Sequence, residues 1–377
     1  MKILVLDNSV DITGANNSIV KSSSSIASPG FEFSFVYPVN SSCINKTAAL
    51  GFNCYAINYI EIRKKIYNLL FYIPCLLINS YKISRIVKKE QIDIIHVNDI
   101  FNLCGITAKL FCRVKVITHV RRMPETFPLK LYRLWTRLHI KFADKIIAVS
   151  EANKKALFYK SPKIEVVYNQ PPLEETEPPY VVRPQLNKKL TAIYTASYIP
   201  GKGQDYAVEM ISRLRKDFPD WELQLQCYGS DYNVQTNIDF KKSLLDKSAA
   251  AHIENSIILN GTTDKVEKLV KQTDIVFNLS DSESFSRTTL EALYWGVPII
   301  ATNVGGTAEM VINGVTGTLA ERRDVEGMYQ GLKKLVADDT YRMAMCQKGY
   351  AYVREKFSVN NTSFKLRDIY LSLLNKN

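Results

Sequence analysis

Residues 274–319 constrain the fold of this 377-residue chain more than any other stretch. Asp274–Ser280 is a short apolar run with the length and composition of a buried strand, and Val297–Thr302 is a second such run. Between them, Thr288–Trp295 carries apolar residues at helical spacing and stops before Gly296, a residue that commonly follows the end of a helix. The order of strand, helix and strand predicts one βαβ unit of a parallel sheet.

Two glutamates flank the position where such a sheet binds its ligand. Ligands of open α/β sheets bind at the carboxyl ends of the strands. Glu283 follows the first strand, and Glu291 lies in the early turns of the helix. The N–H groups of the loop and of the helix N-terminus attract an anion, whereas a carboxylate accepts hydrogen bonds from neighbouring hydroxyls. The unit therefore predicts a diphosphate site with a carboxylate on either side for sugar hydroxyls, which suits a nucleotide-sugar.

The nine residues Glu283-Ser-Phe-Ser-Arg-Thr-Thr-Leu-Glu291 resemble the Glu-x7-Glu motif of the retaining glycosyltransferases of glycosyltransferase family four. The flanking residues agree with that family in order: Gly296-Val-Pro, Gly305-Gly306, Glu309 and Asn313-Gly314. The resemblance implies the GT-B fold, in which two Rossmann-like α/β domains face a cleft and a C-terminal helix crosses back to the first domain. The alternative is an ordinary βαβ unit whose glutamates are solvated.

The length of the chain suggests two domains, and a proline-rich segment marks their boundary. We predict an acceptor-binding Rossmann-like domain over residues 1–170, a linker over 171–186, a nucleotide-sugar-binding domain over 187–360 and a returning helix over 361–377. Charge changes at the linker. Residues 1–173 hold 24 Lys and Arg against 11 Asp and Glu, a net charge of +13, whereas residues 174–377 hold 25 against 26, a net charge of −1.

The basic first half favours an anionic partner, such as a membrane surface or a phosphorylated acceptor. Nucleic acid is not expected, because no recognisable binding module is present. The alternative is a charge that only keeps the protein in solution. Residues 62–89 contain an apolar run between basic clusters, which is too short to span a bilayer and is interrupted by Pro74. This segment is either a basic amphipathic helix at the membrane interface or a helix buried against the sheet.

Seven cysteines without a Cys-x-x-Cys pair favour reduced thiols over a disulfide framework or a zinc site. We therefore expect a cytoplasmic protein, with peripheral contact at the inner face of the plasma membrane. No metal and no other cofactor is expected, because no Asp-x-Asp stands at a strand end of the predicted cleft. Lys202 and helix N-termini would neutralise the diphosphate instead.

Lys202 lies in a glycine-flanked loop before a helix that begins at Gln204. The family usually carries an Arg five residues before this Lys, where the present chain has Ser197, so one cation fewer would contact the diphosphate. Arg287 is a candidate to compensate. Gly14 is half of the glycine pair that the family places near the donor diphosphate, and a simple strand–helix turn explains it nearly as well. The helix after this turn is predicted to begin at Ser18. The full set of predicted donor-binding residues is Gly14, Ser197, Lys202, Glu283, Ser284, Phe285, Ser286, Arg287 and Glu291.

His119 follows the strand Lys115–Thr118, and the resemblance implies that it faces the donor sugar. With Glu283 and Lys202 it completes the predicted catalytic set. Arg121 and Arg122 follow in the same loop and could hold an acceptor phosphate, because Arg suits bidentate phosphate recognition. The alternative for both is a solvated loop.

The sequence thus predicts a retaining transferase of hexosyl type that moves a sugar from a nucleotide-diphosphate donor to a saccharide acceptor. A lipid-linked acceptor in bacterial surface polysaccharide synthesis is favoured. The alternatives within the same fold are a sugar-nucleotide epimerase, a phosphorylase and a non-catalytic nucleotide-binding protein. A nicotinamide oxidoreductase and a P-loop enzyme are disfavoured, because Gly-x-Gly-x-x-Gly and Gly-x4-Gly-Lys-[Ser/Thr] are both missing.

Overall fold

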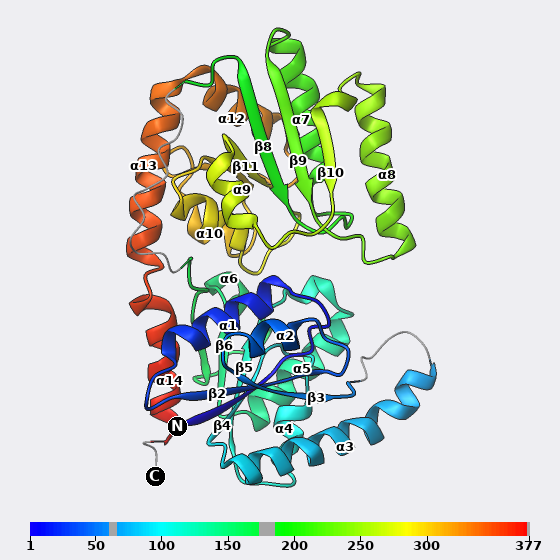
Figure 1. Cartoon of the computed structure of the whole chain (residues 1–377), viewed down its shortest axis with the longest axis vertical. Coiled ribbons are helices and arrows are strands. Elements are labelled where there is room, and N and C mark those ends of the chain that lie inside the picture. Colours follow the sequence, from blue (N-terminus) through cyan, green and yellow to red (C-terminus); the bar gives the residue numbers. More distant parts are fainter. Residues whose placement is uncertain (60–65, 173–184, 375–377) are drawn as a thin grey trace. The chain divides into compact units, whose positions relative to one another are not determined.

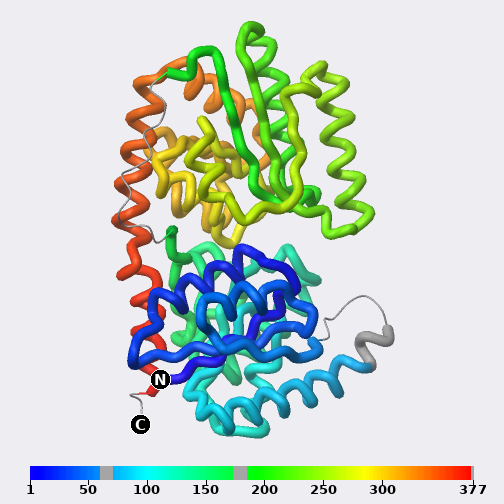
Figure 2. The backbone as a smooth tube through the Cα atoms, viewed as in Figure 1, coloured from blue at the N-terminus to red at the C-terminus, as the bar shows by residue number. Residues whose placement is uncertain are grey.

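The computed structural model describes residues 1–59, 66–172 and 185–374 and divides into two compact units (Figures 1 and 2). Unit 1 comprises residues 1–170 and 359–377, and unit 2 comprises residues 171–358. Each unit has one parallel β-sheet with helices on both faces, so the predicted class of two Rossmann-like α/β domains is confirmed. Most of the predicted linker, residues 173–184, lies outside the described residues, as do residues 62–65 of the predicted amphipathic segment.

The sheet of unit 1 has seven parallel strands in the order β3-β2-β1-β4-β5-β6-β7. Because every pair is parallel, all carboxyl ends lie at one edge of the sheet. The chain order reverses between β1 and β4, which is where such a sheet offers a ligand site. The strands are β1 Lys2–Leu6, β2 Glu32–Pro38, β3 Asn53–Ile57, β4 Ile94–Val97, β5 Lys115–Val120, β6 Lys145–Ala148 and β7 Ile164–Val166.

The helices of unit 1 cover both faces of its sheet (Figure 1). One helix begins earlier than the sequence predicted: α1 starts at Gly14 instead of Ser18, because the Thr13 hydroxyl accepts the N–H of Asn16 at 3.1 Å and caps the first turn. The helices are α1 Gly14–Ile26, α2 Cys43–Ala48, α3 Ile66–Glu90, α4 Cys104–Ala108, α5 Leu129–Phe142, α6 Glu151–Lys155 and α14 Lys365–Leu374, with short helical turns at Pro124–Thr126 and Asn360–Phe364.

Strand alternation sorts the core of unit 1 into two layers. The even-numbered residues of β1, such as Leu4 and Leu6, pack with α3, α4 and α5. The odd-numbered residues, such as Ile3 and Val5, pack with α1 and with the C-terminal helix α14. The C-terminal helix therefore belongs to unit 1, as predicted.

Helix α3 runs along the outside of unit 1 (Figures 1 and 2) and continues through Pro74. The sequence analysis left two alternatives for this segment, and the helix is buried along only part of its length. Ile83 and Val87 are buried in the core, whereas Phe71 and four further apolar side chains of its earlier turns are exposed. No helix among the described residues is both long enough and apolar enough to cross a membrane.

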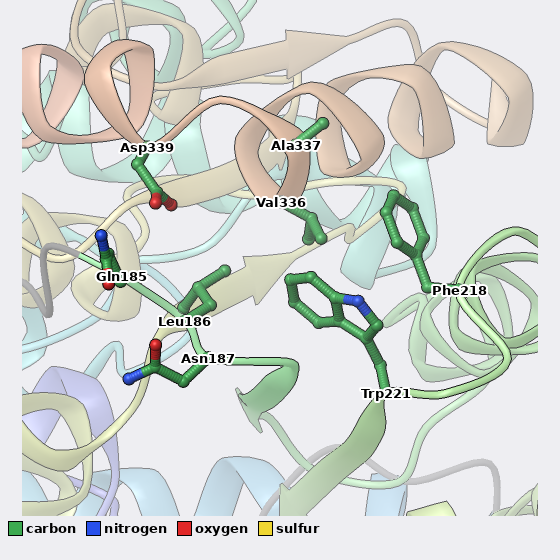
Figure 3. A pocket seen from close by; sticks show the side chains of 8 residues that line it. All are labelled: Gln185, Leu186, Asn187, Phe218, Trp221, Val336, Ala337 and Asp339. Atoms are coloured by element: carbon green, nitrogen blue, oxygen red, sulfur yellow. The ribbon is translucent and has the colours of Figure 1, made fainter.

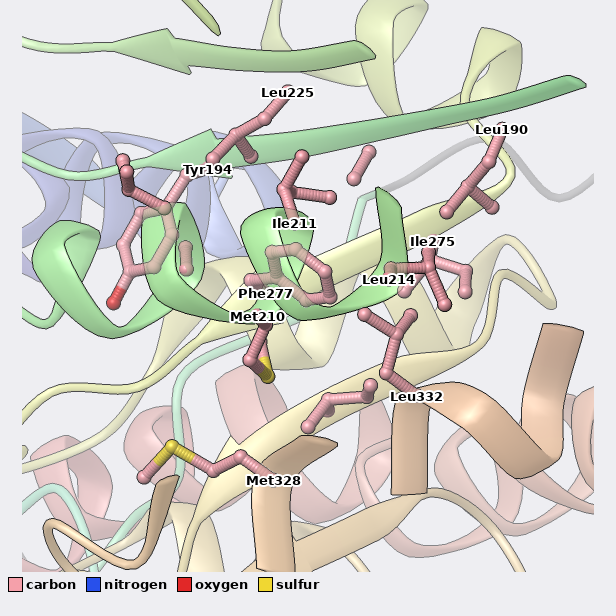
Figure 4. Packing of buried hydrophobic residues seen from close by; sticks show 14 of the residues in the cluster. Leu190, Tyr194, Met210, Ile211, Leu214, Leu225, Ile275, Phe277, Met328 and Leu332 are labelled. Atoms are coloured by element: carbon pink, nitrogen blue, oxygen red, sulfur yellow. The ribbon is translucent and has the colours of Figure 1, made fainter. Parts of the chain in front are cut away.

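The sheet of unit 2 has six parallel strands in the order β10-β9-β8-β11-β12-β13, and the predicted βαβ unit, β11-α10-β12, forms part of it. Figure 4 shows its core, in which Ile211 and Leu214 pack with Phe277 and with Met328 and Leu332. The strands are β8 Lys189–Thr195, β9 Glu222–Tyr228, β10 Ile257–Asn260, β11 Ile275–Asn278, β12 Ile299–Thr302 and β13 Thr318–Ala320. The helices are α7 Gln204–Asp217, α8 Gln235–Ala250, α9 Val266–Gln272, α10 Arg287–Tyr294, α11 Thr307–Met310, α12 Val325–Ala337 and α13 Asp339–Lys356, with a short turn at Glu254–Ser256.

Candidate functional site

The candidate donor site lies at the carboxyl ends of β8 and β11, which are neighbours in the centre of the unit 2 sheet. The strand order reverses between them, so this is the position at which doubly wound sheets bind ligands. The loop after β8 contains Lys202 and the loop after β11 contains Glu283. A backbone hydrogen bond of 2.8 Å from the N–H of Asp281 to the carbonyl oxygen of Gly201 joins the two loops.

Lys202 and Glu283 form an ion pair at this position. The Lys202 ammonium donates to the Glu283 carboxylate, with 2.7 Å between Nζ and Oε1. Both side chains are partly exposed, 31% for Lys202 and 19% for Glu283. The pair therefore places one cation and one carboxylate side by side, where each can still be reached by a ligand.

Tyr194, which the sequence analysis did not single out, holds the Lys202 loop against β11. Its buried hydroxyl donates to the carbonyl oxygen of Lys202 and accepts the N–H of Leu279 at 2.8 Å. Gly203 allows this close approach: a Cβ atom there would lie 2.2 Å from the carbonyl oxygen of Leu279, and its φ of +83° favours glycine. These contacts fix where the Lys202 ammonium can reach.

Glu283 is supported from behind by the Gly305-Gly306 loop. The N–H of Gly306 donates to the carbonyl oxygen of Glu283 at 3.2 Å. A Cβ atom at Gly305 would lie 1.7 Å from the same oxygen. Gly305 and Gly306 thus allow the backbones of the two loops to come into contact.

The second predicted carboxylate, Glu291, is paired within its own helix. Arg287 donates to it at 2.7 Å across one turn of α10, and Glu291 is buried. The Ser286 hydroxyl caps α10 by accepting the N–H of Thr289 at 3.1 Å. Arg287, the expected substitute for the missing Arg at position 197, thus lies beside Glu291, where its charge stays close to the N-terminus of the helix.

The remaining predicted donor residues lie around this centre or in the other unit. Ser197 donates to the Tyr232 hydroxyl at 2.9 Å on the outer side of the loop after β8. Ser284, Phe285 and Ser286 connect Glu283 to α10. Gly14 belongs to unit 1, where it is the first residue of α1.

Unit 1 gathers polar side chains at its own strand ends, and Arg121 is at their centre. Its guanidinium donates to Asn98 at 2.8 Å and to Asn169 at 2.6 Å, and Asn98 in turn donates to the Asp7 carboxylate at 2.9 Å. Arg121 is 7% exposed. Arg121 thus connects the ends of β1, β4 and β7, so the alternative of a solvated loop does not apply to it.

Arg122 is the more exposed of the two arginines. Its side chain is 52% exposed and its Nε lies 3.4 Å from the buried carboxylate of Asp99. The guanidinium also lies over the rings of Phe101 and Phe127. Burial raises the pKa of Asp99, and the positive charge of Arg122 opposes that shift.

His119 is the penultimate residue of β5, because the strand continues to Val120 instead of ending at Thr118 as predicted. Its side chain is buried beside that of His96. Burial and the nearby charge of Arg121 lower the pKa of His119 well below the ordinary value and the pKa of His96 to about 3. Both imidazoles are therefore neutral near neutral pH.

A separate hollow of about 420 Å³ lies in unit 2 away from these residues (Figure 3). Leu186, Asn187 and Trp221 line it, and they precede β8 and β9 in the chain. It therefore lies at the amino ends of the strands, opposite to the edge where parallel sheets bind ligands. Within residues 1–59, 66–172 and 185–374 no three His, Cys, Asp or Glu side chains are grouped so as to hold a metal ion.

The sheet of unit 2, with a cation and carboxylates at its switch point, defines the protein as a doubly wound α/β protein with a candidate ligand site. Residues 12–171 match the family model for Glycosyltransferase Family 4, and residues 182–352 match the model for Glycosyl transferases group 1. The chain belongs to this family of two-domain glycosyltransferases, as the Glu283–Glu291 motif predicted.

Curated relatives and solved structures agree with this assignment. The chain is 26% identical over 337 residues to the N-acetyl-alpha-D-glucosaminyl L-malate synthase of Bacillus anthracis, with 84% of each chain covered. It is 24% identical over 326 residues to the UDP-Gal:alpha-D-GlcNAc-diphosphoundecaprenol alpha-1,3-galactosyltransferase of Escherichia coli, with 79% of each covered. Anabaena HepE in complex with UDP and glucose superposes with a TM-score of 0.83 at 20% identity, covering 99% of this chain and 100% of HepE. This likeness shows that the chain has the GT-B fold.

Proposed function

We propose that the protein is a retaining glycosyltransferase that moves a hexose from a uridine diphosphate donor to a saccharide acceptor. The observation that carries the proposal is the Lys202–Glu283 pair at the switch point of unit 2. The choice of UDP is supported by HepE, which is described with UDP and UDP-glucose, and by the Escherichia coli relative, whose name includes UDP-Gal.

Binding of the donor would separate the two oppositely charged side chains of this ion pair. The Lys202 ammonium would exchange Glu283 for the diphosphate, since a phosphate carries more charge and more acceptor atoms than one carboxylate. Glu283 would then accept hydrogen bonds from hydroxyls of the transferred sugar. Glu291, which is already paired with Arg287, would accept hydrogen bonds from both hydroxyls of the ribose. The N-terminus of α10 adds its partial positive charge near the leaving group.

Retention follows if the acceptor attacks from the face that the diphosphate leaves. A phosphate oxygen would take the acceptor proton, and no side chain would be needed as the base. The lowered pKa of His119 supports this, because an effective general base has a pKa near the working pH. His119 would instead hold a sugar hydroxyl, so His119→Ala should lower turnover more than nucleotide affinity.

The test is a screen of nucleotide-sugars with mass analysis of products, followed by NMR of the purified product. We expect transfer in the presence of an acceptor and an α-anomeric coupling constant from an α-linked donor. A β-linkage would contradict retention. Conversion of the donor without any acceptor would favour an epimerase, and tight UDP binding without turnover would favour a non-catalytic binding protein. Activity should survive EDTA, because Lys202 and the N-terminus of α10 supply the positive charge; loss that magnesium restores would show that a metal is required.

We further propose that the acceptor is lipid-linked, as in bacterial surface polysaccharide synthesis, and that α3 contacts an anionic membrane. Phe71, Leu77, Ile78 and Tyr81 are exposed apolar side chains on α3, between 41% and 61% exposed. The same exposed face continues into basic residues in the later turns of the helix: Lys82, Arg85, Lys88 and Lys89. Apolar side chains beside lysines and arginines suit the interface of a bilayer with anionic headgroups.

Sedimentation with vesicles tests the membrane contact. Binding to vesicles with anionic lipid should exceed binding to neutral vesicles and should fall with salt, because the screening length shortens from about 10 Å at 0.1 M to about 3 Å at 1 M. Leu77→Asp should weaken binding. Leu245→Asp is the matched control, because Leu245 of α8 is similarly exposed, 48% against 41%. Equal effects of the two variants, or equal binding to both vesicles, would contradict the role of α3.

A further inference from the structure

Three buried side chains of unit 1 form a continuous series of hydrogen bonds that ends at His119. The Tyr370 hydroxyl lies 2.6 Å from Nδ1 of His96, and Nε2 of His96 lies 3.3 Å from Nδ1 of His119. Tyr370 and His96 are fully buried and His119 is 3% exposed. At the far end, Nε2 of His119 is buried and has no hydrogen-bond partner among the described residues.

We propose that Tyr370, acting through His96, is a positioning residue that keeps the proton of His119 on Nε2. His119 then presents a fixed N–H donor to an oxygen atom of the bound substrate. The identity of that substrate rests on the proposed function, whereas the position of the proton rests only on the contacts within unit 1.

The fold brings these residues together from three separate segments. His96 is on β4 and His119 on the neighbouring β5. Each follows an isoleucine that faces α14, Ile94 or Ile117, by two residues, so both histidines lie on that same face of the sheet. Tyr370 is on α14 between apolar residues that bury the helix against this face of the sheet. The aromatic rings of His96 and Tyr370 meet edge-on at 5.8 Å. The C-terminal helix is thus linked, through His96, to a residue near the carboxyl end of β5.

Counting protons decides the direction of the hydrogen bonds. A neutral imidazole carries one proton, so each ring donates from one nitrogen and accepts at the other. A phenol is a better donor than an imidazole N–H, and an imidazole nitrogen is a better acceptor than a phenol oxygen. Tyr370 therefore donates to Nδ1 of His96, which leaves the His96 proton on Nε2. That N–H donates to Nδ1 of His119, so the proton of His119 must be on Nε2.

Two features of the surroundings keep both rings neutral, which the count requires. The rings are buried, and the cationic Arg121 is close enough to oppose a second positive charge; both effects lower the pKa of each histidine. A protonated His96 would donate from both nitrogens, so the Tyr370 hydroxyl would have to accept and would no longer determine which nitrogen of His96 carries the proton.

A third histidine of unit 1 provides an internal reference. His139 lies with Nε2 2.8 Å from the carbonyl oxygen of Ile100 and with Nδ1 2.7 Å from the Thr118 hydroxyl. A carbonyl oxygen only accepts, so His139 must carry its proton on Nε2. His139 is on the opposite face of the sheet from His96, because it contacts Thr118 instead of His119.

The test is nitrogen-15 NMR of the full chain with labelled histidine, which gives few signals because the chain has four histidines. The chemical shift and the proton couplings of each ring nitrogen show whether it carries the proton. We expect His119 to match His139, with the proton on Nε2 and none on Nδ1. A proton on Nδ1 of His119 in the unaltered protein would overturn the proposal, and this result needs neither a variant nor an active enzyme.

Tyr370→Phe tests whether the hydroxyl is the cause. Without its donor, His96 can take either tautomer, so the His119 signals should shift toward a mixture while those of His139 stay unchanged. Turnover should fall by roughly two- to tenfold, the effect of losing one neutral hydrogen bond, with little change in UDP affinity. If His119 keeps its proton wholly on Nε2 in Tyr370→Phe, the hydroxyl does not set the tautomer and the proposal fails.

The matched control is Tyr37→Phe. Tyr37 is also fully buried in unit 1, and its hydroxyl makes hydrogen bonds with Asn16 at 3.0 Å and Thr47 at 2.9 Å. This variant should lose a similar amount of stability without altering the His119 signals; a matching change in both variants would assign the effect to general loosening of unit 1. If no donor is transferred but the predicted tautomer is found, the proposed function fails while the hydrogen-bond series stands.

Discussion

Gly305→Ala should damage the donor site through the backbone alone. The added Cβ would lie 1.7 Å from the carbonyl oxygen of Glu283, whereas real Cβ atoms essentially never come closer than 3.0 Å to such an atom. One of the two loops must therefore move by roughly 1.3 Å, the difference between these distances. A misplacement of about 1 Å can cost about a hundredfold in rate. The φ of +47° adds a backbone strain of about 1–2 kcal/mol for alanine.

Gly314→Ala separates the effect of the steric clash from the effect of the backbone strain. Gly314 is in the same unit with a φ of +74°, but the nearest atom to its added Cβ is the Tyr341 hydroxyl at 3.8 Å, so it carries the strain without the clash. Chemical unfolding should show a loss of about 1–2 kcal/mol for Gly314→Ala and a larger loss for Gly305→Ala. With the donor as varied substrate, kcat/KM should fall about a hundredfold only in Gly305→Ala. If the two variants stay within a factor of two of each other, the Gly305 loop does not position Glu283.

Two further predictions concern binding and acid stability. Glu291→Ala should weaken calorimetric UDP binding by about 1.5–3 kcal/mol, the cost of a lost charged hydrogen bond, whereas Glu326→Ala on the exposed side of α12 should not; equal affinities would remove Glu291 from the site. The free energy of unfolding should fall on acidification. In the unfolded chain the histidines take up protons near pH 6.5, whereas in the folded protein the buried His96 and His139, with pKa values of about 3 and 4, stay neutral at that pH. Each should contribute about 2 kcal/mol of loss between pH 7 and pH 5 in urea titrations, and an unchanged midpoint would show that these rings are not buried as neutral groups.

Local sequence patterns were sufficient to predict most of the fold. The strands β11 and β12 lie within the apolar runs Asp274–Ser280 and Val297–Thr302 that predicted them, because each run is defined by its own residues without help from the rest of the chain. The Glu283–Glu291 stretch could be predicted equally well, because its strand, loop and helix are consecutive in the chain. The early start of α1 was missed because its Thr13 cap was not recognised.

The contacts that long-range packing creates could not be read in advance. Tyr194 supports the Lys202 loop through a hydrogen bond to Leu279, 85 residues further along the chain. Tyr370 meets His96 across 274 residues. Neither tyrosine has a sequence signature, because only the register of the sheets and the return of α14 place their hydroxyls. The partners of Arg121 could not be predicted for the same reason, because Asn98 and Asn169 come from two other strand ends.

Calorimetric titration of UDP into the unaltered protein and into Lys202→Met tests the donor site most directly. Lys333→Met is the control, because Lys333 pairs with Asp217 at 2.7 Å in the same unit, on α12. We expect one UDP site in the unaltered protein and in the control, and an affinity at least roughly tenfold weaker in Lys202→Met, as the loss of a charged hydrogen bond predicts. Equal affinity in all three proteins would contradict a nucleotide-sugar site built on Lys202 and Glu283.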